Sequence, residues 1–407
     1  MEVLHRSCAG LDVHKASVVA CVRKMKGRKV LREVRTFGTT TAELLELGDW
    51  LVEEGCTQVV MEATGVFWKP VWHLLEGRVE LVLANAQEVR NVPGRKSDVN
   101  DATWLADLIA HGLVRASFVP PQPIADLREL TRTRKQLTRE VAKHIQRIQK
   151  VLETCNIKLA SVVQKFFGAS TRAMLRAIVD GETDPEKLAE LAKGTLRAKR
   201  GALKKALHGR IRDHHRIILG SHLRIIESLR DEIEALETRM EEVLVPFAEA
   251  VERLQTIPGI GPTAAQVIIA EIGVDMTRFR TAGHLRSWAG LCPRMDESAG
   301  KKRSRKTRHG NKWLKTMLVQ CAWSAAKKEG YLKALFRNVR RRRGGKRAAV
   351  AVAAAMLTAI HGMLRDNSDF RDLGEDHFSN HDKKIIAASL ARRLRGLGYE
   401  VEMRKAS

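Results

Sequence analysis

The chain has 407 residues, of which 44% are hydrophobic, so it is long enough for two or three domains with cores of their own. Its formal net charge of +25 and its pI near 10.2 indicate a polyanionic partner, most simply nucleic acid. Because it contains no run of about 18 apolar residues and no basic-then-apolar leader, we expect neither a membrane span nor a secretion signal.

Residues 5–114 have the pattern of an α/β domain. "SCAGLDVHKASVVACVRK" predicts two strands joined by a short turn, and "VLREVRTFGT" predicts a third. A helical segment, "TAELLELGDWLVEEG", precedes two further strands, "TQVVMEATG" and "VELVLAN", and "SDVNDATWLADLIAHG" predicts a closing helix. Three strands followed by alternating helices and strands is the order of the ribonuclease-H type of fold.

Four carboxylates fall where the elements of such a fold converge. Asp12 lies in the first strand, Glu62 ends the fourth, and Asp98 and Asp101 stand three apart at the start of the last helix. Clustered carboxylates stay ionised only with cations among them, and hard oxygen ligands with no His or Cys nearby favour Mg²⁺ or Mn²⁺. Two such ions would clamp a phosphate between the attacking and leaving oxygens.

Each of these acids also has a purely structural interpretation. Asp98 could cap the helix, and Asp101 could complete a capping box with Ser97. Asp12 could stand in a turn, and Glu62 could be a surface acid. All four falling on converging elements by accident is the less economical explanation.

Beyond "PPQP" at 120–123, helices are predicted to about residue 250. Apolar residues step by three and four along one of them, as a coiled-coil seam does: Ile226, Leu229, Ile233, Leu236, Met240 and Val243. Such a seam needs a partner helix. The partner is either the earlier helix of the same chain, around 130–152, or a second copy.

The last part opens with "LQTIPGIGPTAAQVIIAEIG", the pattern of a helix-hairpin-helix. Its Gly259 and Gly261 would let the backbone turn tightly, so that N–H groups at the start of the second helix face a phosphate. The alternative is a helix pair that serves only as scaffold. "NKWLKTMLVQCAWSAAKK" predicts a later helix capped by Asn311, and a polar tail follows Asp366.

The basic surplus is concentrated in this last part. Between Lys301 and Arg347 there are 18 Lys or Arg residues and one acid, Glu329. We expect these side chains to bind phosphates of nucleic acid. The candidates are Lys301, Lys302, Arg303, Arg305, Lys306, Arg308, Lys312, Arg341, Arg342 and Arg343.

Ser298 stands directly before this run, in "DESAGKKRSRKTRHGN", in a loop that Gly300 and Gly310 would keep mobile. It could be a spacer, a phosphate ligand or a nucleophile, and Ser287 and Ser304 are rivals on sequence alone. A free hydroxyl needs activation, which a metal ion held by the four acids could supply.

The motifs together resemble one family of insertion-sequence transposases. "GLDVHK", "MEATGVFW", "KSDVNDATWLADL", "IPGIGPTAAQVIIAEIG", "WAGLCPRMDESAGKKRSRKTRHGNKWLK" and "RRRRGGKRAAVAV" are similar, in order, to motifs of the IS110 family, whose relatives include the pilin-gene invertases. The resemblance implies that Asp12, Glu62, Asp98 and Asp101 are the catalytic acids and that Ser298 is the nucleophile. Glu88 and Asp107 are further acids near the same region.

The resemblance also implies an architecture and partners. Residues 1–120 would form a RuvC-like catalytic domain with a DEDD acid set, residues 121–250 a helical, coiled-coil region for oligomerisation, and residues 251–407 a mostly α domain that bears the serine. The expected partners are donor and target double-stranded DNA, a noncoding bridge RNA that selects both sites, and further copies of the chain, as a dimer or tetramer. The expected location is the bacterial cytoplasm, at the nucleoid, in keeping with six scattered cysteines and no zinc motif.

Two other functions fit part of this pattern. A metal-dependent RuvC-like junction nuclease would use the same acids to activate water, with Ser298 as a bystander. A nucleic-acid-binding protein with an inactive catalytic centre would need only the basic surface, although the intact set of acids argues against it.

Overall fold

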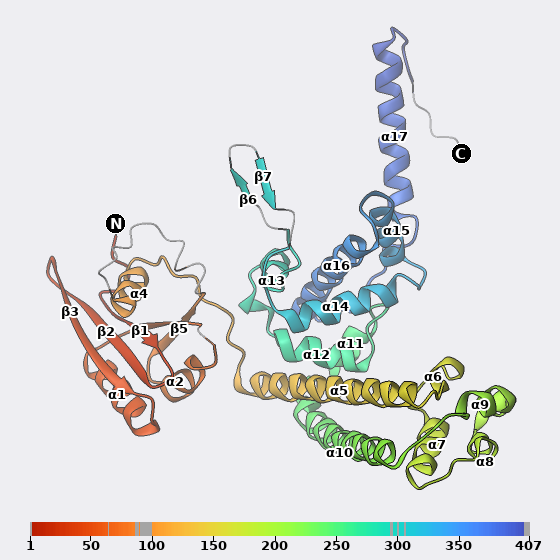
Figure 1. The fold of residues 1–407 in the computed structure, drawn as a ribbon. Helices are drawn as coiled ribbons and strands as arrows, with labels where there is room; N and C mark the ends of the chain where they lie inside the picture. Colours follow the sequence, from red (N-terminus) through yellow and green to blue (C-terminus); the bar gives the residue numbers. More distant parts are fainter. Residues whose placement is uncertain are drawn as a thin grey trace. The chain divides into compact units, whose positions relative to one another are not determined.

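The computed structural model of the protein describes residues 2–63, 65–85, 89, 100–293, 296–298, 301–304 and 307–402, with 296–298, 301–304, 378–386 and 389 described by their backbone alone. The chain forms two compact units, Met1–Val119 and Pro120–Ser407. Figure 1 shows a sheet with helices in the first and a largely helical second.

Unit 1 is built on a mixed five-stranded sheet. Its strands are β1 (Ser7–Val13), β2 (Ser17–Lys26), β3 (Lys29–Gly38), β4 (Gln58–Glu62) and β5 (Glu80–Ala84). They lie in the order β3-β2-β1-β4-β5, with antiparallel pairing from β1 to β3 and parallel pairing among β1, β4 and β5. This is the ribonuclease-H-like arrangement that the element order predicts.

Helices cover both faces of this sheet. Side chains alternate across a strand, so Leu11 and Met61 pack into a core with α1 (Thr41–Glu53) and α2 (Trp68–Leu75). Cys8 and Val60 face the other way, into a core with α4 (Asp101–Ala110). The sheet therefore has one face for α1 and α2 and one face for α4.

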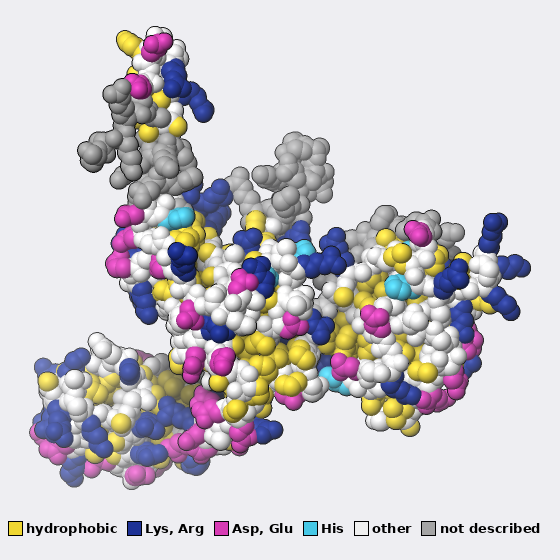
Figure 2. All heavy atoms as spheres, turned by 180° about the vertical axis from the view of Figure 1, so that it is seen from behind, with side chains coloured by type: hydrophobic (Ala, Val, Ile, Leu, Met, Phe, Trp, Pro, Cys, Tyr) yellow, Lys and Arg dark blue, Asp and Glu magenta, His cyan; other side chains and the backbone are white. Residues whose placement is uncertain are grey.

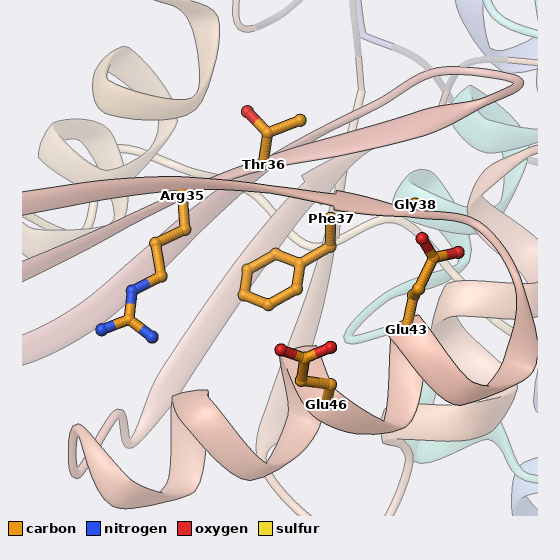
Figure 3. Close-up of a pocket in the computed structure, with 6 residues that line it drawn as sticks. All are labelled: Arg35, Thr36, Phe37, Gly38, Glu43 and Glu46. Atoms are coloured by element: carbon orange, nitrogen blue, oxygen red, sulfur yellow. The ribbon is translucent and has the colours of Figure 1, made fainter.

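The α1 face carries a hollow beside the edge strand β3. It is lined by Arg35, Thr36, Phe37, Gly38, Glu43 and Glu46 (Figure 3). Thr40 and Glu43 form the capping box that begins α1, and the Phe37 and Trp50 rings lie 5.5 Å apart. This hollow is a structural feature of the α1 packing and contains none of the four predicted acids.

Two long helices begin unit 2 and pack against each other. They are α5 (Gln122–Thr154) and α10 (Asp213–Leu244), and the contacts His144–His222 and Arg134–Glu237 show that they run antiparallel. Between them in sequence come α6 (Leu159–Val162), α7 (Ala169–Val179), α8 (Pro185–Glu190), a 3-10 turn (Gly194–Lys199) and α9 (Arg200–Leu207), which close one end of the pair with a shared core. The predicted seam of α10 thus has a partner within the chain.

The remainder of unit 2 is mostly helical. It comprises a 3-10 turn (Val245–Phe247), α11 (Ala248–Gln255), α12 (Pro262–Ile272), a 3-10 turn (Met276–Arg278), α13 (Ala282–Trp288), the strands β6 (Asp296–Ser298) and β7 (Lys301–Ser304), α14 (Lys312–Ala325), α15 (Tyr331–Arg343), α16 (Gly345–Asp366) and α17 (His377–Gly396). The predicted polar tail therefore contains a 20-residue helix, α17.

One of the described helices, α16, is long and apolar enough to cross a membrane. It packs instead against α13, α14 and α15, and more than half of its apolar stretch is buried within unit 2. Its Ala-rich composition lets these helices approach closely, as expected of a core helix. The sequence shows no unbroken apolar run here because Lys346, Arg347 and His361 interrupt it.

Candidate catalytic and nucleic-acid-binding site

Asp12 and Glu62 lie side by side at the carboxyl ends of neighbouring parallel strands. The last aligned pair of β1 and β4 is Leu11 with Met61, and each acid is the next residue of its strand. Adjacent strands lie about 4.8 Å apart. Gly10 and Val60, which lie two residues before Asp12 and Glu62, face α4. Because side chains two apart on a strand share a face, both acids lie on the α4 face of the sheet.

This placement excludes two of the structural interpretations. Asp12 is paired with Val19 within the sheet and is not in a turn. Glu62 is half-buried, with its Oε1 atom shielded from solvent, so it is not an ordinary surface acid. Both carboxylates are held by strand backbone, which fixes their position more firmly than a loop would.

The start of α4 lies toward the same end of β1. The Sγ of Cys8 is 3.5 Å from the carbonyl oxygen of Ala106, and a Cβ at Gly10 would lie 2.2 Å from the carbonyl oxygen of Ala102. The C-terminal half of β1, which carries Asp12, therefore lies against the N-terminal half of α4, which begins at Asp101. Gly10 is required here because no side chain fits between strand and helix.

The capping interpretation of the acids before α4 is wrong. The helix begins at Asp101, and its cap is Asn100, whose Oδ1 accepts a hydrogen bond from the Ala102 N–H at 2.8 Å. Asp101 is the first helical residue and so cannot be the third position of a box with Ser97. Asp98, like Ser97 and Glu88, lies outside the described residues.

The carboxylate of Asp107 accepts hydrogen bonds from two arginines. Its Oδ1 accepts from Arg23 Nε and from an Arg32 guanidinium nitrogen, both at 2.9 Å. These bonds tie α4 to β2 and β3, and Arg23 is almost fully buried. Asp107 therefore anchors the helix that carries Asp101.

His14 is a neighbour of the acids that sequence reasoning missed. Its Nε2 lies 3.1 Å from Oδ2 of Asp12, and its ring is exposed. The expectation that no His stands near the acids is thus wrong. The signal is present in the sequence, because residues two apart on an extended chain face the same side.

The donor set fits a hard divalent cation. Asp12, Glu62 and Asp101 offer carboxylate oxygens from three elements that meet at one edge, the ligands that Mg²⁺ and Mn²⁺ prefer. Within the described ranges no three His, Cys, Asp or Glu side chains are already grouped as a cation cage. Ligation would require Asp12 to turn from His14.

Ser298 lies on a short β-hairpin rather than on an irregular loop. It is the last residue of β6 and pairs with Lys301 of β7. The side chains of Ser298, Lys301, Lys302 and Arg303 are outside the described set, as are Arg305 and Lys306 entirely. Arg308 and Lys312, farther down the segment, are exposed.

The base of this hairpin is tightly fixed. The Arg308 N–H donates to Cys292 O at 3.1 Å, and the Asn311 N–H donates to Trp288 O at 3.2 Å. A Cβ at Gly310 would lie 2.3 Å from the Gly290 nitrogen. Gly310 therefore leaves room for a close backbone crossing at the base of the segment.

A buried carboxylate also binds the base of this hairpin. Glu271 of α12 is fully buried and accepts two hydrogen bonds of 2.8 Å from Arg132, while Asn311 Nδ2 donates to it. The Oδ1 of Asn311 accepts from the Trp313 and Leu314 N–H groups at 3.0 Å, which confirms its predicted role as the cap of α14. The sequence signal for Glu271 is a lone acid in the apolar helix "AAQVIIAEIG".

Arg128 completes this network. It donates to the Ala270 and Glu271 carbonyl oxygens, at 3.1 and 2.8 Å. Burial lowers the pKa of Arg128 to about 10, against the opposing attraction of Glu271. The network joins α5, α12 and the end of the serine hairpin into one body.

The two glycines of the predicted helix-hairpin-helix differ in their surroundings. Gly259 has φ +93°, and a Cβ there would lie 2.6 Å from Cys321 O and 2.7 Å from Ala325 N, so the turn packs directly on α14. Gly261 is exposed, has open space around it and precedes the first residue of α12. Packing thus explains Gly259, and Gly261 is the more exposed of the two glycines.

Basic side chains occur on both units. Figure 2 shows Lys and Arg side chains projecting from the tip of the β2–β3 hairpin, where Lys26, Arg28 and Lys29 are exposed. In unit 2, Arg341, Arg342 and Arg343 are exposed at the end of α15. Each unit therefore presents exposed cations of its own.

Comparison with known proteins gives a consistent result. A DEDD transposase profile of the IS110 group matches residues 9–157, and the profile described as "Transposase IS116/IS110/IS902 family" matches residues 251–337. A Pseudomonas aeruginosa protein, "Probable family 20 transposase", is 30% identical over 24% of this chain and 31% of its own length. The "Transposase for insertion sequence element IS1111A" of Coxiella burnetii is 26% identical over 78% of this chain and 79% of its own length.

Unit 1 has a ribonuclease-H-like sheet with acids at the ends of β1 and β4, and a helical region with a basic hairpin follows it. Together with the matching profile, these features define a transposase of the DEDD class. Enzymes of this class transfer DNA phosphoryl groups. The two profiles together span more than half of the residues. The chain belongs to the IS110/IS116/IS902 family of transposases. Membership implies a divalent metal ion.

Proposed function

We propose that the chain is the transposase of an insertion sequence and that it cuts and rejoins donor and target DNA through a covalent bond to Ser298. The observation that carries the proposal is the adjacency of Asp12 and Glu62 on the face that α4 covers, with Asp101 opening that helix. In this proposal Asp12, Glu62, Asp98 and Asp101 hold Mg²⁺ or Mn²⁺.

The acids and the serine have distinct roles. A bound divalent ion supplies Lewis-acid stabilisation of the phosphate and lowers the pKa of a hydroxyl beside it. The Ser298 Oγ gives up its proton and forms a bond to phosphorus, the bond from phosphorus to one strand's oxygen breaks, and that oxygen takes up a proton. The basic side chains around Ser298 hold the DNA backbone and offset charge in the transition state.

A serine nucleophile suits an enzyme that must rejoin strands. Exchanging a phosphodiester for a phosphoserine ester is nearly isoenergetic, so the bond energy is kept and no ATP is required. The sequence contains no GxxxxGK[ST] phosphate loop, in agreement with an ATP-free reaction. Hydrolysis by water would leave breaks instead.

The partners follow from family resemblance and charge. We propose that a noncoding bridge RNA pairs with both DNAs and selects the sites, and that the net charge of +25 serves to bind these polyanions. The acids belong to unit 1 and Ser298 to unit 2. This division suits a dimer or tetramer in which the acids of one subunit complete the serine of another, at work on DNA in the bacterial cytoplasm.

The experiment removes one acid without changing its shape. Asp101→Asn should lower DNA cleavage on the order of 100-fold or more, because metal stabilisation of several kcal/mol depends on the carboxylate charge. DNA binding, measured by gel shift, should be retained. Glu46→Gln, an equal loss of charge on the opposite face of the sheet (Figure 3), is the matched control and should cleave normally.

The product ends separate this proposal from the junction nuclease. Protein-linked ends support the serine recombinase, whereas free 5′ phosphates with no adduct identify the nuclease that uses water. Asp101→Asn with unchanged cleavage would remove Asp101 from both mechanisms, and absence of any cleavage by the wild type with Mg²⁺ would leave only a DNA-binding function.

A further inference from the structure

The end of α15 and the start of α16 carry a dense basic surface that the Ser298 chemistry does not use. Six exposed cations lie within eight residues there: Arg340, Arg341, Arg342, Arg343, Lys346 and Arg347. Earlier in α15, Lys333 and Arg337 pair with Glu329 and Glu375, but none of the six forms an ion pair with any acid in the described parts of the chain. Their mutual repulsion is therefore uncompensated.

Local helix stability does not explain all of these charges. The four arginines end α15, where cations complement the helix dipole. Lys346 and Arg347, however, occupy the first turn of the 22-residue helix α16, where cations oppose the dipole. That first turn contains no acid. Such a local conflict is typical of a functional surface. A polyanion bound across the Gly344 turn would relieve it.

An exposed indole stands beside these cations. Trp323 of α14 is 44% exposed, and its ring lies 5.3 Å from that of Phe336 in an edge-on arrangement. A Cβ at Gly345 would lie 3.2 Å from Cη2 of Trp323, so the glycine makes room for the ring directly next to Lys346. The indole is thus seated by Phe336 and Gly345 while much of its surface faces solvent.

We propose that Trp323 and the cations from Arg340 to Arg347 form a binding site for an unpaired stretch of DNA strand. One base stacks on the indole, and the neighbouring phosphates contact the cations. Stacking on a protein ring needs a base whose face is free, which a duplex does not offer. DNA is the ligand because it is the substrate of this transposase family, and nothing in the site requires a 2′-hydroxyl.

The inference rests on the proposed function in one respect: cutting and rejoining DNA exposes the unpaired strands that this site would bind. Binding needs neither Ser298 nor a divalent ion, so the test uses the full chain with Ser298→Ala in EDTA. A failure of the serine mechanism would leave the result unchanged. The probe is an oligodeoxythymidine of about 12 nucleotides, within the usual site size, and the comparison is a duplex of equal length.

Trp323→Ala should weaken binding of the single strand by about five- to a hundredfold, the range for loss of one stacked base, and leave duplex binding within about twofold. Trp323→Phe should restore most of the affinity because it keeps an aromatic face. Arg343→Gln should weaken binding and reduce its salt dependence, whereas Arg337→Gln, which loses a cation already paired with Glu375, should not.

A second readout protects the result against a folding defect. A bromodeoxyuridine version of the probe should crosslink on irradiation to the peptide that contains Trp323. Unchanged single-strand affinity in a folded Trp323→Ala, equal weakening of single strand and duplex, or crosslinks confined to other peptides would overturn the proposal. Markedly tighter binding of the matching RNA, lost with Trp323→Ala, would overturn the assignment to DNA.

Discussion

Glu271 and Glu140 both bond to basic side chains, but their surroundings give these bonds different weights. Glu271 is fully buried and meets Arg128, Arg132 and Asn311. Glu140 sits on the surface of α5, bonded to Lys143 at 2.7 Å. A buried charge left without its partner is costly, whereas an exposed pair contributes little.

We predict that Glu271→Gln destabilises unit 2 by about 3 kcal/mol, because it leaves the two arginines without their counter-charge. Glu140→Gln, the surface control, should change stability by less than about 0.5 kcal/mol. Urea unfolding followed by circular dichroism measures both. Equal effects of the two substitutions would show that the Glu271 network is not structural.

Individual residues also show what local sequence reasoning can reach. Asn311 is predictable as a cap because the signal lies within three residues of the helix it begins. The cap of α4 is not, because several polar residues precede that helix and only the fold shows that Asn100 takes the position. Glu271 depends on Asn311, 40 residues away, and on Arg132, 139 residues away, and Gly310 depends on Gly290, so no local pattern encodes these partners.

At the scale of elements, the α5–α10 pair contains a titratable contact. The Nδ1 atoms of His144 and His222 lie 3.0 Å apart, which requires one nitrogen to donate and the other to accept. Burial lowers the pKa of both rings below 6.5, and Arg147 lowers them further, while Glu140 opposes this at His144. The neutral forms are therefore the ones that the helix pair favours.

The sign of the pH effect follows from linkage. Since both folded-state pKa values are lowered, the contribution of the pair is complete above pH 6.5 and is lost as the pH falls through the folded values. Thermal melting between pH 7.5 and pH 5 should show a smaller loss for His222→Gln than for the wild type. The exposed His208→Gln serves as the control and should follow the wild type; the same pH response in both variants would refute the assignment.

The β6–β7 hairpin gives a second prediction at this scale. Replacing Lys301, Lys302 and Arg303 of β7 by Gln should weaken duplex DNA binding at physiological salt. The slope of log affinity against log salt should become shallower by about 0.9 for each phosphate that these cations no longer neutralise. Lys204→Gln, which removes an exposed lysine already bonded to Glu186, is the control. A weaker affinity with an unchanged slope would mean that these cations do not bind phosphates.

Elements with a strong local period are predictable from the sequence, and those shaped by packing are not. The five strands of unit 1 alternate or run apolar, and their order matches the predicted type of fold. The segment around Ser298 has no strand pattern in its sequence, because charged residues dominate it, yet its backbone pairs as a hairpin. Below that hairpin the backbones cross closely at Gly290 and Gly310, a contact between residues 20 apart. The seam of α10 leaves two partners open, and the α5 contacts identify the one within the chain.

At the scale of the whole molecule, the sequence places the acids in one unit and Ser298, beside a run of cations, in the other. Charge and motifs indicate a nucleic-acid enzyme, and the fold explains why Asp12 and Glu62 meet although 50 residues separate them. The proposed mechanism requires the serine of one unit to act with the acids of the other. The proposed function therefore depends on chemistry that joins the two.

The most direct measurement of that chemistry is to trap the covalent protein–DNA adduct after denaturation, using wild-type protein with its DNA, the bridge RNA and Mg²⁺. The proposed mechanism predicts an adduct with wild type, with Ser287→Ala and with Ser304→Ala, and none with Ser298→Ala. Peptide mapping should place the phosphoester on Ser298. Equal adduct from wild type and Ser298→Ala, or cleavage that continues with free 5′ phosphates when Ser298 is absent, would contradict it.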